Sequence, residues 1–280
     1  MKRKFKIGVM SDCLGLGPEG GVKKAAELGA DGVQVWTTGG KMSAEQMNAS
    51  GRAGFKALCA DLGLQIASLC GDLGAGFHNP QTNPQNIERT KRIIDLAVDL
   101  GTKVVTTHIG VVPENPGDAA YRIMLAACRE MAEHAAGKGV TFAVETGPEK
   151  AVTLRRFLDD VGSPGIGVNL DPANLVMVVA DDPVAAVHTL EDYIVHTHAK
   201  DGIRLRPTDA AKTYSGRTPP ELGPGFKEVP LGEGGVRWDD YLDALSEIGY
   251  TGYLTIEREV GKDPVGDIAR AITFLRSKMK

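Results

Sequence analysis

Two histidines, a lysine and an aspartate end a short apolar run in the stretch Tyr193-Ile-Val-His-Thr-His-Ala-Lys-Asp201. The aromatic and β-branched residues at its start are typical of a strand. Alternation along such a strand places Ile194, His196 and His198 on one face. Two imidazoles on one face at the C-terminal end indicate a strand that opens into an active site. We expect His198 to bind a metal ion there.

Eight segments of this kind alternate with segments of helical periodicity. The expected strands cover residues 5–10, 33–36, 65–69, 104–107, 141–145, 165–170, 192–197 and 252–256. Glycines such as Gly101 and Gly139 stand just before strands, at the position that favours a left-handed helix C-cap. The alternation predicts parallel strands joined by right-handed crossovers. Eight such units over residues 1–280 predict an α/β fold, a single-domain (β/α)₈ TIM barrel.

Local signals predict where helices begin and where the barrel is interrupted. Ser43-x-x-Gln46 has the form of a capping box, and Asp182-Pro183 and Asp263-Pro264 each place a capping aspartate before a proline. Residues 202–235 are rich in proline and glycine and form the main irregularity. We expect a long βα loop there, because loops of such length in a compact domain are usually functional or act as lids.

The phase of each strand predicts which side chains face the barrel axis. Residues that face the helices must be apolar, so alternate residues point inward. With Val144, Val168 and Ile256 facing out, the inward positions at the strand ends are acidic: Glu145, Asp171 and Glu257. The same rule turns a further set inward: Met10, Asp12, Gln34, Trp36, Thr106 and His108. The acids lie at the C-terminal ends of their strands, where barrel enzymes carry their sites.

Three carboxylates that meet an imidazole in a narrow space predict a metal ion. Like charges so close are unfavourable unless a cation lies among them. The predicted ligands are Glu145, Asp171, His198 and Glu257. Hard oxygen donors with one nitrogen favour Mn²⁺, and Mg²⁺, Co²⁺ or Zn²⁺ also suit the set. One such acid alone would be read as a helix cap or a salt-bridge partner, but four residues in phase favour a site.

The remaining histidines are assigned by their position in the pattern. His196 lies one inward position deeper than His198, so it either supports the site and its substrate or is a hydrogen-bonded core residue. His108, at the inward end of the fourth strand, is expected to contact a substrate. The others are expected on loops or at the surface: His78, His134 and His188.

Composition excludes several classes of protein. The net charge is −4, and lysine and arginine are spread along the chain, so neither nucleic acid nor an anionic membrane is expected as a partner. No apolar run approaches membrane-spanning length, and the basic N-terminus lacks the apolar segment of a signal peptide. Four scattered cysteines without a C-x-x-C motif predict reduced thiols in a cytoplasmic protein. Gly15-Leu-Gly17-Pro-Glu-Gly20 matches the dinucleotide fingerprint only in its letters, so no cofactor besides the metal is predicted.

With these residues identified, the chain resembles the xylose isomerase-like TIM-barrel superfamily, in its sugar phosphate isomerase/epimerase branch. The resemblance runs from about Ile7 to the C-terminus. It depends on five motifs: Ala143-Val-Glu-Thr146, Asn169-Leu-Asp-Pro-Ala-Asn174, Val195-His-Thr-His-Ala-Lys-Asp201, Leu231-Gly-Glu-Gly234 followed by Trp238, and Thr255-Ile-Glu257.

The resemblance implies a function as well as a fold. In ketose 3-epimerases the residues matching the four predicted ligands hold a metal, and the two matching glutamates, Glu145 and Glu257, act as acid and base. Arg204 falls where such epimerases hold a substrate-contacting arginine. Asn174 departs from the pattern, because those epimerases carry histidine there. The predicted substrate-binding set is Trp36, His108, Asn174, His196, Lys200 and Arg204.

These implications predict a metal-dependent isomerase or epimerase of a sugar or sugar phosphate. The metal polarises a ketone, one glutamate removes the α-proton, and the other returns a proton to the opposite face. The enediolate between these steps would be stabilised by the metal together with Lys200, His196 or Arg204.

Several alternatives remain open at this stage. A lyase or dehydratase of a keto-sugar or inosose would use the same chemistry and expel a leaving group. An AP endonuclease-like enzyme would need a histidine at Asn174 and a basic surface, and a non-catalytic sugar-binding barrel would need no metal. A homo-oligomer is compatible with the sequence. Basic residues of the long loop either clamp a substrate phosphate or are solvated: Arg204, Arg206, Lys212, Arg217 and Lys227.

Overall fold

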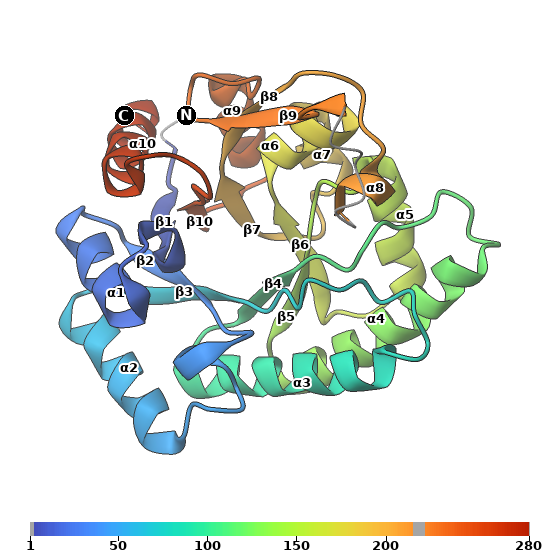
Figure 1. Ribbon diagram of the computed structural model, residues 1–280, viewed down its shortest axis with the longest axis horizontal. Coiled ribbons are helices and arrows are strands. Elements are labelled where there is room, and N and C mark those ends of the chain that lie inside the picture. Colours follow the sequence, from blue (N-terminus) through green and yellow to red (C-terminus); the bar gives the residue numbers. More distant parts are fainter. Residues whose placement is uncertain (1–2, 215–221, 280) are drawn as a thin grey trace.

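A computed structural model of the chain describes residues 3–214 and 222–279, and its centre is a closed barrel of eight parallel strands (Figure 1). Around the barrel the strands follow the order β1-β10-β7-β6-β5-β4-β3-β2. The strands are β1 (Lys6–Met10), β2 (Gly32–Trp36), β3 (Gln65–Cys70), β4 (Val104–Thr107), β5 (Thr141–Glu145), β6 (Ile166–Leu170), β7 (Ile194–Ala199) and β10 (Tyr253–Ile256). The predicted TIM barrel is confirmed, and each predicted strand lies within two residues of the observed one.

Helices surround the barrel and bury their apolar faces against it. They are α1 (Gly17–Glu27), α2 (Ala49–Asp61), α3 (Asn83–Leu100), α4 (Ala119–Lys138), α5 (Ala151–Val161), α7 (Pro183–Thr189), α9 (Trp238–Glu247) and α10 (Pro264–Lys278). In α3, the stripe that includes Ile93, Ile94 and Ala97 is buried, as its spacing predicts. Within the described residues, no helix is long and apolar enough to cross a membrane.

Most of the predicted helix boundaries are confirmed. The carboxylates of Asp182 and Asp263 accept backbone N–H groups at the starts of α7 and α10. Gly101 and Gly139 end α3 and α4 with φ of 80° and 66°, in the left-handed region.

The predicted capping box at Ser43 is wrong. Residues 43–47 form one isolated turn, and α2 begins after Asn48, whose side chain accepts the N–H of Gly51 at 2.9 Å. Arg52 holds this turn in place by donating to the carbonyls of Ala44 and Met47. The real N-cap is therefore the asparagine nearest the helix, which satisfies an otherwise unpaired amide.

The described part of the long βα loop that was expected over residues 202–235 contains regular structure, and Arg217, one of its predicted basic residues, lies outside the described residues. Strands β8 (Asp201–Arg204) and β9 (Phe226–Val229) pair as an antiparallel hairpin, and a short helix, α8 (Ala210–Tyr214), lies between them. The hairpin contacts α6 (Pro172–Asn174) and the following π-helical turn (Leu175–Val179), beside the carboxyl ends of β6 and β7 (Figure 1).

A single buried carboxylate, that of Asp201, ties both ends of this insertion together. Its Oδ1 accepts the N–H groups of Gly202 (2.9 Å) and Val236 (3.1 Å). Its Oδ2 accepts those of Gly232 (2.9 Å) and Gly234 (3.2 Å) and the indole N–H of Trp238 (2.9 Å). Five donors compensate the burial of this charge and fix the path of the chain beside the barrel mouth.

We predict that Asp201→Asn lowers the free energy of unfolding by about 2–3 kcal/mol, since an amide group would face N–H donors where an oxygen now accepts. Urea denaturation of the variant and of the wild type measures the change. Asp118→Asn is the matched control, because Asp118 is exposed and its side chain caps no helix. Equal stability of Asp201→Asn and the control would contradict the role given to this carboxylate.

Candidate active site

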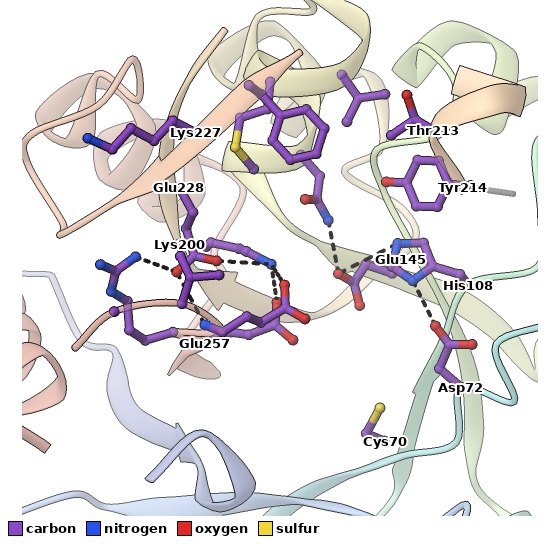
Figure 2. Close-up of a pocket in the computed structure, with 18 of the residues that line it drawn as sticks. Cys70, Asp72, His108, Glu145, Lys200, Thr213, Tyr214, Lys227, Glu228 and Glu257 are labelled. Carbon is purple, nitrogen blue, oxygen red and sulfur yellow. Dashed lines mark hydrogen bonds and ion pairs between the residues drawn. The ribbon is translucent and has the colours of Figure 1, made fainter. Parts of the chain in front are cut away.

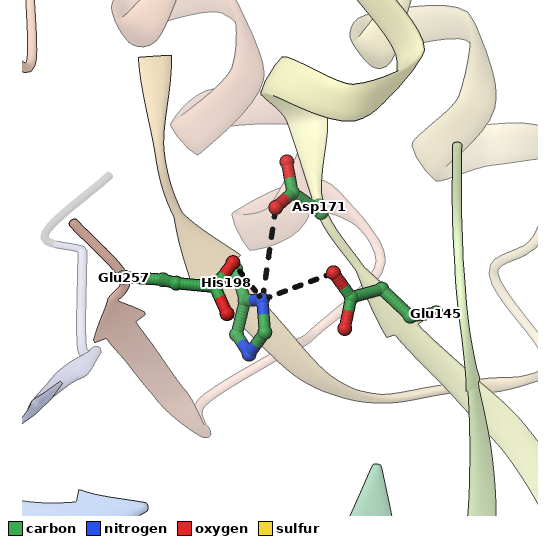
Figure 3. A group of neighbouring side chains, drawn as sticks. All are labelled: Glu145, Asp171, His198 and Glu257. Carbon is green, nitrogen blue, oxygen red and sulfur yellow. Dashed lines mark ion pairs between the residues drawn. The ribbon is translucent and has the colours of Figure 1, made fainter. Parts of the chain in front are cut away.

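Four buried side chains from four strand ends come together at the mouth of the barrel (Figure 3). Glu145 ends β5, Asp171 follows β6, His198 lies in β7 and Glu257 follows β10. Each offers one ligand atom, and these atoms lie within 4.8 Å of one another. His198 Nδ1 lies 3.4 Å from Glu145 Oε1, 3.6 Å from Asp171 Oδ2 and 3.2 Å from Glu257 Oε2. The structure thus brings together the four residues that the strand phases predict as metal ligands.

Two atoms of this group are buried without a hydrogen-bond partner: His198 Nδ1 and Asp171 Oδ2. Such atoms are unfavourable in a protein interior unless something else binds them. The opposite ring nitrogen, His198 Nε2, lies 3.1 Å from Gln34 Oε1 and 3.2 Å from Asn169 Nδ2. Gln34 directs its own amide N–H to Thr106 Oγ1 at 2.8 Å, so its oxygen is left to accept from the ring. Nε2 then carries a proton, and Nδ1, which is directed at the three carboxylates, is the nitrogen that would bind a hard divalent cation.

The electrostatics of the group favour a positive charge at the same place. Burial alone would lower the pKa of His198, but Glu257 and Glu145 raise it well above its usual range. For Glu257, burial opposes ionisation, yet His198 and Lys200 lower its pKa. A metal ion would supply this positive charge by displacing the proton from the ring.

A cavity of about 770 Å³ opens at the mouth of the barrel, beside Glu145 and Glu257 (Figure 2). Glu145 and Glu257 line it, together with four of the predicted substrate-binding residues: Trp36, His108, Asn174 and Lys200. Asn174 lies directly beside one glutamate, since its Nδ2 donates to Glu145 Oε1 at 3.1 Å. The volume is in the range of small-molecule sites, about 300–1,000 Å³.

The two other predicted substrate-binding residues do not line the cavity. His196 is buried beneath His198, and its Nε2 lies 2.8 Å from Thr255 Oγ1 and 3.3 Å from Ser68 Oγ. Burial, followed by the charge of His198, lowers the pKa of His196 to about 3. These contacts are those of a neutral core histidine. Arg204 points its guanidinium at the carbonyl of Arg206 in the loop.

Lys200 is held by acids on the wall of the cavity. Its Nζ lies 2.9 Å from Glu257 Oε2, contacts Glu259, and is 3.9 Å from Glu228 Oε2. Burial alone would lower its pKa, but these acids and Asp171 raise it well above its usual range. Lys200 therefore stays charged and orients Glu257.

His108 contacts Asp72 and Tyr214, two residues that the sequence did not predict as part of the site. Its Nδ1 lies 3.0 Å from Asp72 Oδ2, and its ring centroid lies 5.1 Å from that of Tyr214. Burial lowers the pKa of His108, but Glu145 and Asp72 outweigh it and raise the pKa to about 9. Asp72 stands in a glycine-rich loop and Tyr214 at the end of a short helix in the insertion, so neither carries a periodic signal.

The family to which this chain belongs follows from its similarity to known proteins. A model of the family described as xylose isomerase-like TIM barrel matches residues 22–278. The chain belongs to this family. Other xylose isomerase-like barrels therefore provide the relatives with which the site can be compared.

Relatives with known names include two epimerases. A 2-epi-5-epi-valiolone 7-phosphate 2-epimerase of Actinoplanes sp. is 28% identical over 79% of this chain and 76% of its own. The L-ribulose-5-phosphate 3-epimerase UlaE of Escherichia coli is 24% identical over 91% of this chain and 87% of its own. An uncharacterized protein of Methanocaldococcus jannaschii is 24% identical over 69% of this chain, and the match spans 64% of that relative's length.

Solved structures share the fold over nearly the whole chain. A xylose isomerase domain protein of Planctomyces limnophilus superposes with a TM-score of 0.80 at 27% identity, covering 99% of this chain and 98% of its own. A D-allulose 3-epimerase of Methylomonas sp. in complex with D-allulose has a TM-score of 0.74 at 18% identity, covering 99% and 98%. A xylose isomerase-like barrel of Mycobacterium smegmatis in complex with magnesium has a TM-score of 0.72 at 20% identity, covering 98% and 96%.

We predict that the protein binds one Mn²⁺ or Mg²⁺ per chain and that Asp171→Asn weakens this binding at least ~100-fold, because loss of one anionic ligand leaves the cation undercompensated. Isothermal titration of metal into chelator-treated protein measures the affinity. Asp72→Asn is the control, since Asp72 lines the same cavity but lies outside the group of four. Unchanged metal affinity in Asp171→Asn would remove this residue from the ligand set.

Glu149 is buried near the barrel mouth outside the group of four, and burial raises its pKa to about 8. Its Oε2 accepts the N–H of Val112 at 3.0 Å, whereas Oε1 is buried without a partner. Between about pH 5 and pH 8 the Glu149 carboxyl keeps its proton in the folded state, whereas in the unfolded chain, where its pKa is lower, it is ionised. The free energy of unfolding contributed by this carboxyl therefore falls as the pH rises through that range. Glu149→Gln should be about 1–3 kcal/mol more stable than wild type at pH 8, with the gain shrinking toward pH 5.

Urea denaturation at both pH values measures this difference, and the exposed Glu133→Gln is the control. A stability gain in Glu149→Gln that is independent of pH would show that the carboxyl does not titrate in this range.

Proposed function

We propose that the protein is a metal-dependent sugar isomerase or epimerase that moves a proton at the carbon next to a ketone. The observation that carries the proposal is the placement of Glu145 and Glu257. They flank His198 Nδ1 from β5 and β10, two strands separated in the barrel by β6 and β7, and both line the cavity. Two carboxylates on opposite sides of one centre suit removal of a proton from one face of a carbon and its return to the other.

The residues that would hold the metal are Glu145, Asp171, His198 and Glu257. Mn²⁺ is the proposed ion, and when bound it supplies Lewis-acid polarisation of the substrate ketone.

The surroundings of the two glutamates differ in a way that suits acid–base work. His198 and Lys200 lower the pKa of Glu257 and keep it ionised, in the form that can accept a proton. Glu145 accepts N–H groups from Asn169 (3.1 Å) and Asn174 (3.1 Å), which fix its orientation without neutralising it. Because epimerisation is reversible, the glutamate that removes the proton in one direction returns it in the other.

His108 and Trp36, which both line the cavity, are proposed to contact the substrate. His108 Nε2 is buried without a partner and lies 3.8 Å from Glu145 Oε1, so it is placed to hydrogen-bond a substrate oxygen near the reacting carbon. Trp36 is 38% exposed although it ends a barrel strand, and such an aromatic face suits packing against a sugar ring.

The relatives support a ketose as substrate. UlaE is named for L-ribulose 5-phosphate, and the Methylomonas structure holds D-allulose. Asn174 donates to Glu145 rather than presenting the histidine expected of ketose 3-epimerases, so the particular sugar is best sought among several ketoses.

We predict that Glu145→Gln and Glu257→Gln each lower the rate of ketose conversion by about 10²–10⁴-fold, since each removes one of the two proton-transfer groups. The metal-loaded proteins are incubated in D₂O with L-ribulose, D-allulose and their terminal phosphate esters, and NMR follows deuterium at the carbon next to the ketone. Exchange in the variants should be abolished or confined to one epimer.

Glu133→Gln, on the exposed face of α4, should retain wild-type exchange. Full conversion by Glu145→Gln would refute the two-glutamate mechanism, and release of water with formation of a new double bond would identify a dehydratase instead.

A further inference from the structure

We infer that the substrate is an uncharged sugar rather than a sugar phosphate, an inference that rests on the proposed function and narrows it. The first observation is the charge of the cavity wall in the described part of the chain. Five carboxylates line the cavity: Asp72, Glu145, Glu228, Glu257 and Glu259. A sixth carboxylate nearby is that of Asp171, which belongs to the group of four predicted metal ligands. Three lysine or arginine side chains oppose them: Lys200, Lys227 and Arg258. Even with a divalent cation bound and His108 protonated, the described residues of the wall leave no surplus of positive charge for a phosphate dianion.

The second observation is that two of the three cations are already paired. Lys200 is held by Glu257 and Glu259. Arg258 donates through Nη1 to Glu228 Oε1 at 2.6 Å and through Nε to Asp267 Oδ2 at 2.8 Å. A phosphate would have to displace these carboxylates from buried, hydrogen-bonded pairs, which is strongly unfavourable.

The third observation concerns Lys227, for which no acidic partner is found among the described residues. It lies in β9, where Phe226 and Glu228 alternate with it. Glu228 is buried, whereas Lys227 is exposed at the edge of the cavity. Figure 2 shows the Lys227 ammonium directed away from Glu145 and Glu257.

TIM-barrel enzymes frequently bind phosphate at the loops after the last two barrel strands, next to a helix N-terminus. Here those loops carry Glu228 and Glu259, and the backbone N–H of Glu259 already donates to Glu228 Oε1 at 3.2 Å. At the start of α10, Asp263 accepts the N–H of Gly266 at 2.9 Å. Two of the amide groups at this place, those of Glu259 and Gly266, are therefore already bound by the chain's own acids.

The rest of the wall supports an uncharged ligand. Met177, Val178, Phe226 and Val260 line the cavity beyond the metal-ligand group, so the part of the substrate that extends from the reacting carbon meets apolar and aromatic surface. Uncharged sugars pack well against such surfaces, whereas a phosphate would lose its hydration there without compensation.

The test compares each sugar with its own phosphate ester: L-ribulose with L-ribulose 5-phosphate, and D-allulose with D-allulose 6-phosphate. On the metal-loaded wild type, kcat/KM should be at least ~10-fold higher for a free sugar than for its ester, as expected for a cleft that repels anions. Glu259→Gln should raise kcat/KM for the ester relative to that for the free sugar, because it removes one negative charge from the cavity wall. Lys227→Gln should change neither. A higher kcat/KM for an ester, lost in Lys227→Gln, would overturn the inference.

Binding separates failure of this inference from failure of the proposed function. Isothermal titration of the same four compounds into the metal-loaded wild type measures their affinities, and NMR of the same mixtures shows whether any compound is turned over. Tighter binding of the free sugars supports the inference even where the wild type turns over none of them, in which case the proposed reaction alone is wrong. Equal or tighter binding of the esters overturns the inference whether or not turnover occurs.

Discussion

The mutual repulsion of three buried carboxylates is the constraint on which the site depends. Glu145, Asp171 and Glu257 direct oxygens at one imidazole nitrogen, and two of the atoms in the group have no hydrogen-bond partner. A protein interior tolerates such a cluster when a cation occupies its centre. The surrounding residues serve this arrangement: Gln34 fixes the histidine tautomer, and Lys200 offsets the remaining charge on Glu257.

The barrel makes the cluster by geometry alone. The strands are parallel and every crossover returns the chain to the same end, so four residues from distant parts of the sequence reach one edge. Their apolar neighbours, such as Val144 and Leu170, pack outward against the helices and force the acids inward. Fold stability and site assembly therefore depend on the same alternation.

This dependence explains what the sequence could and could not predict. The barrel, its eight strands and the meeting of the four predicted ligands follow from period-two alternation and from acids at strand ends, which are local signals. His196 shares that phase with His198, but phase alone does not tell a core histidine from one that reaches the cavity. Asp72 and Tyr214 come from segments whose backbone path is set by tertiary contacts, so no periodicity announces them. The β8–β9 hairpin was not predicted either, because its strands are short and the segment between them, residues 205–225, is rich in glycine and proline.

The adjacent residues Lys200 and Asp201 connect the β8–β9 hairpin to the group around Glu257. Lys200 faces the cavity and contacts Glu257, while Asp201 binds amides from both ends of the insertion. Glu228 in β9 then pairs with Arg258, which follows Glu257 in the chain. The hairpin is thus linked to Glu257 from two directions. Its acidic inner face both orients that glutamate and determines which ligands the cavity admits, so positioning and selectivity arise from one set of ion pairs.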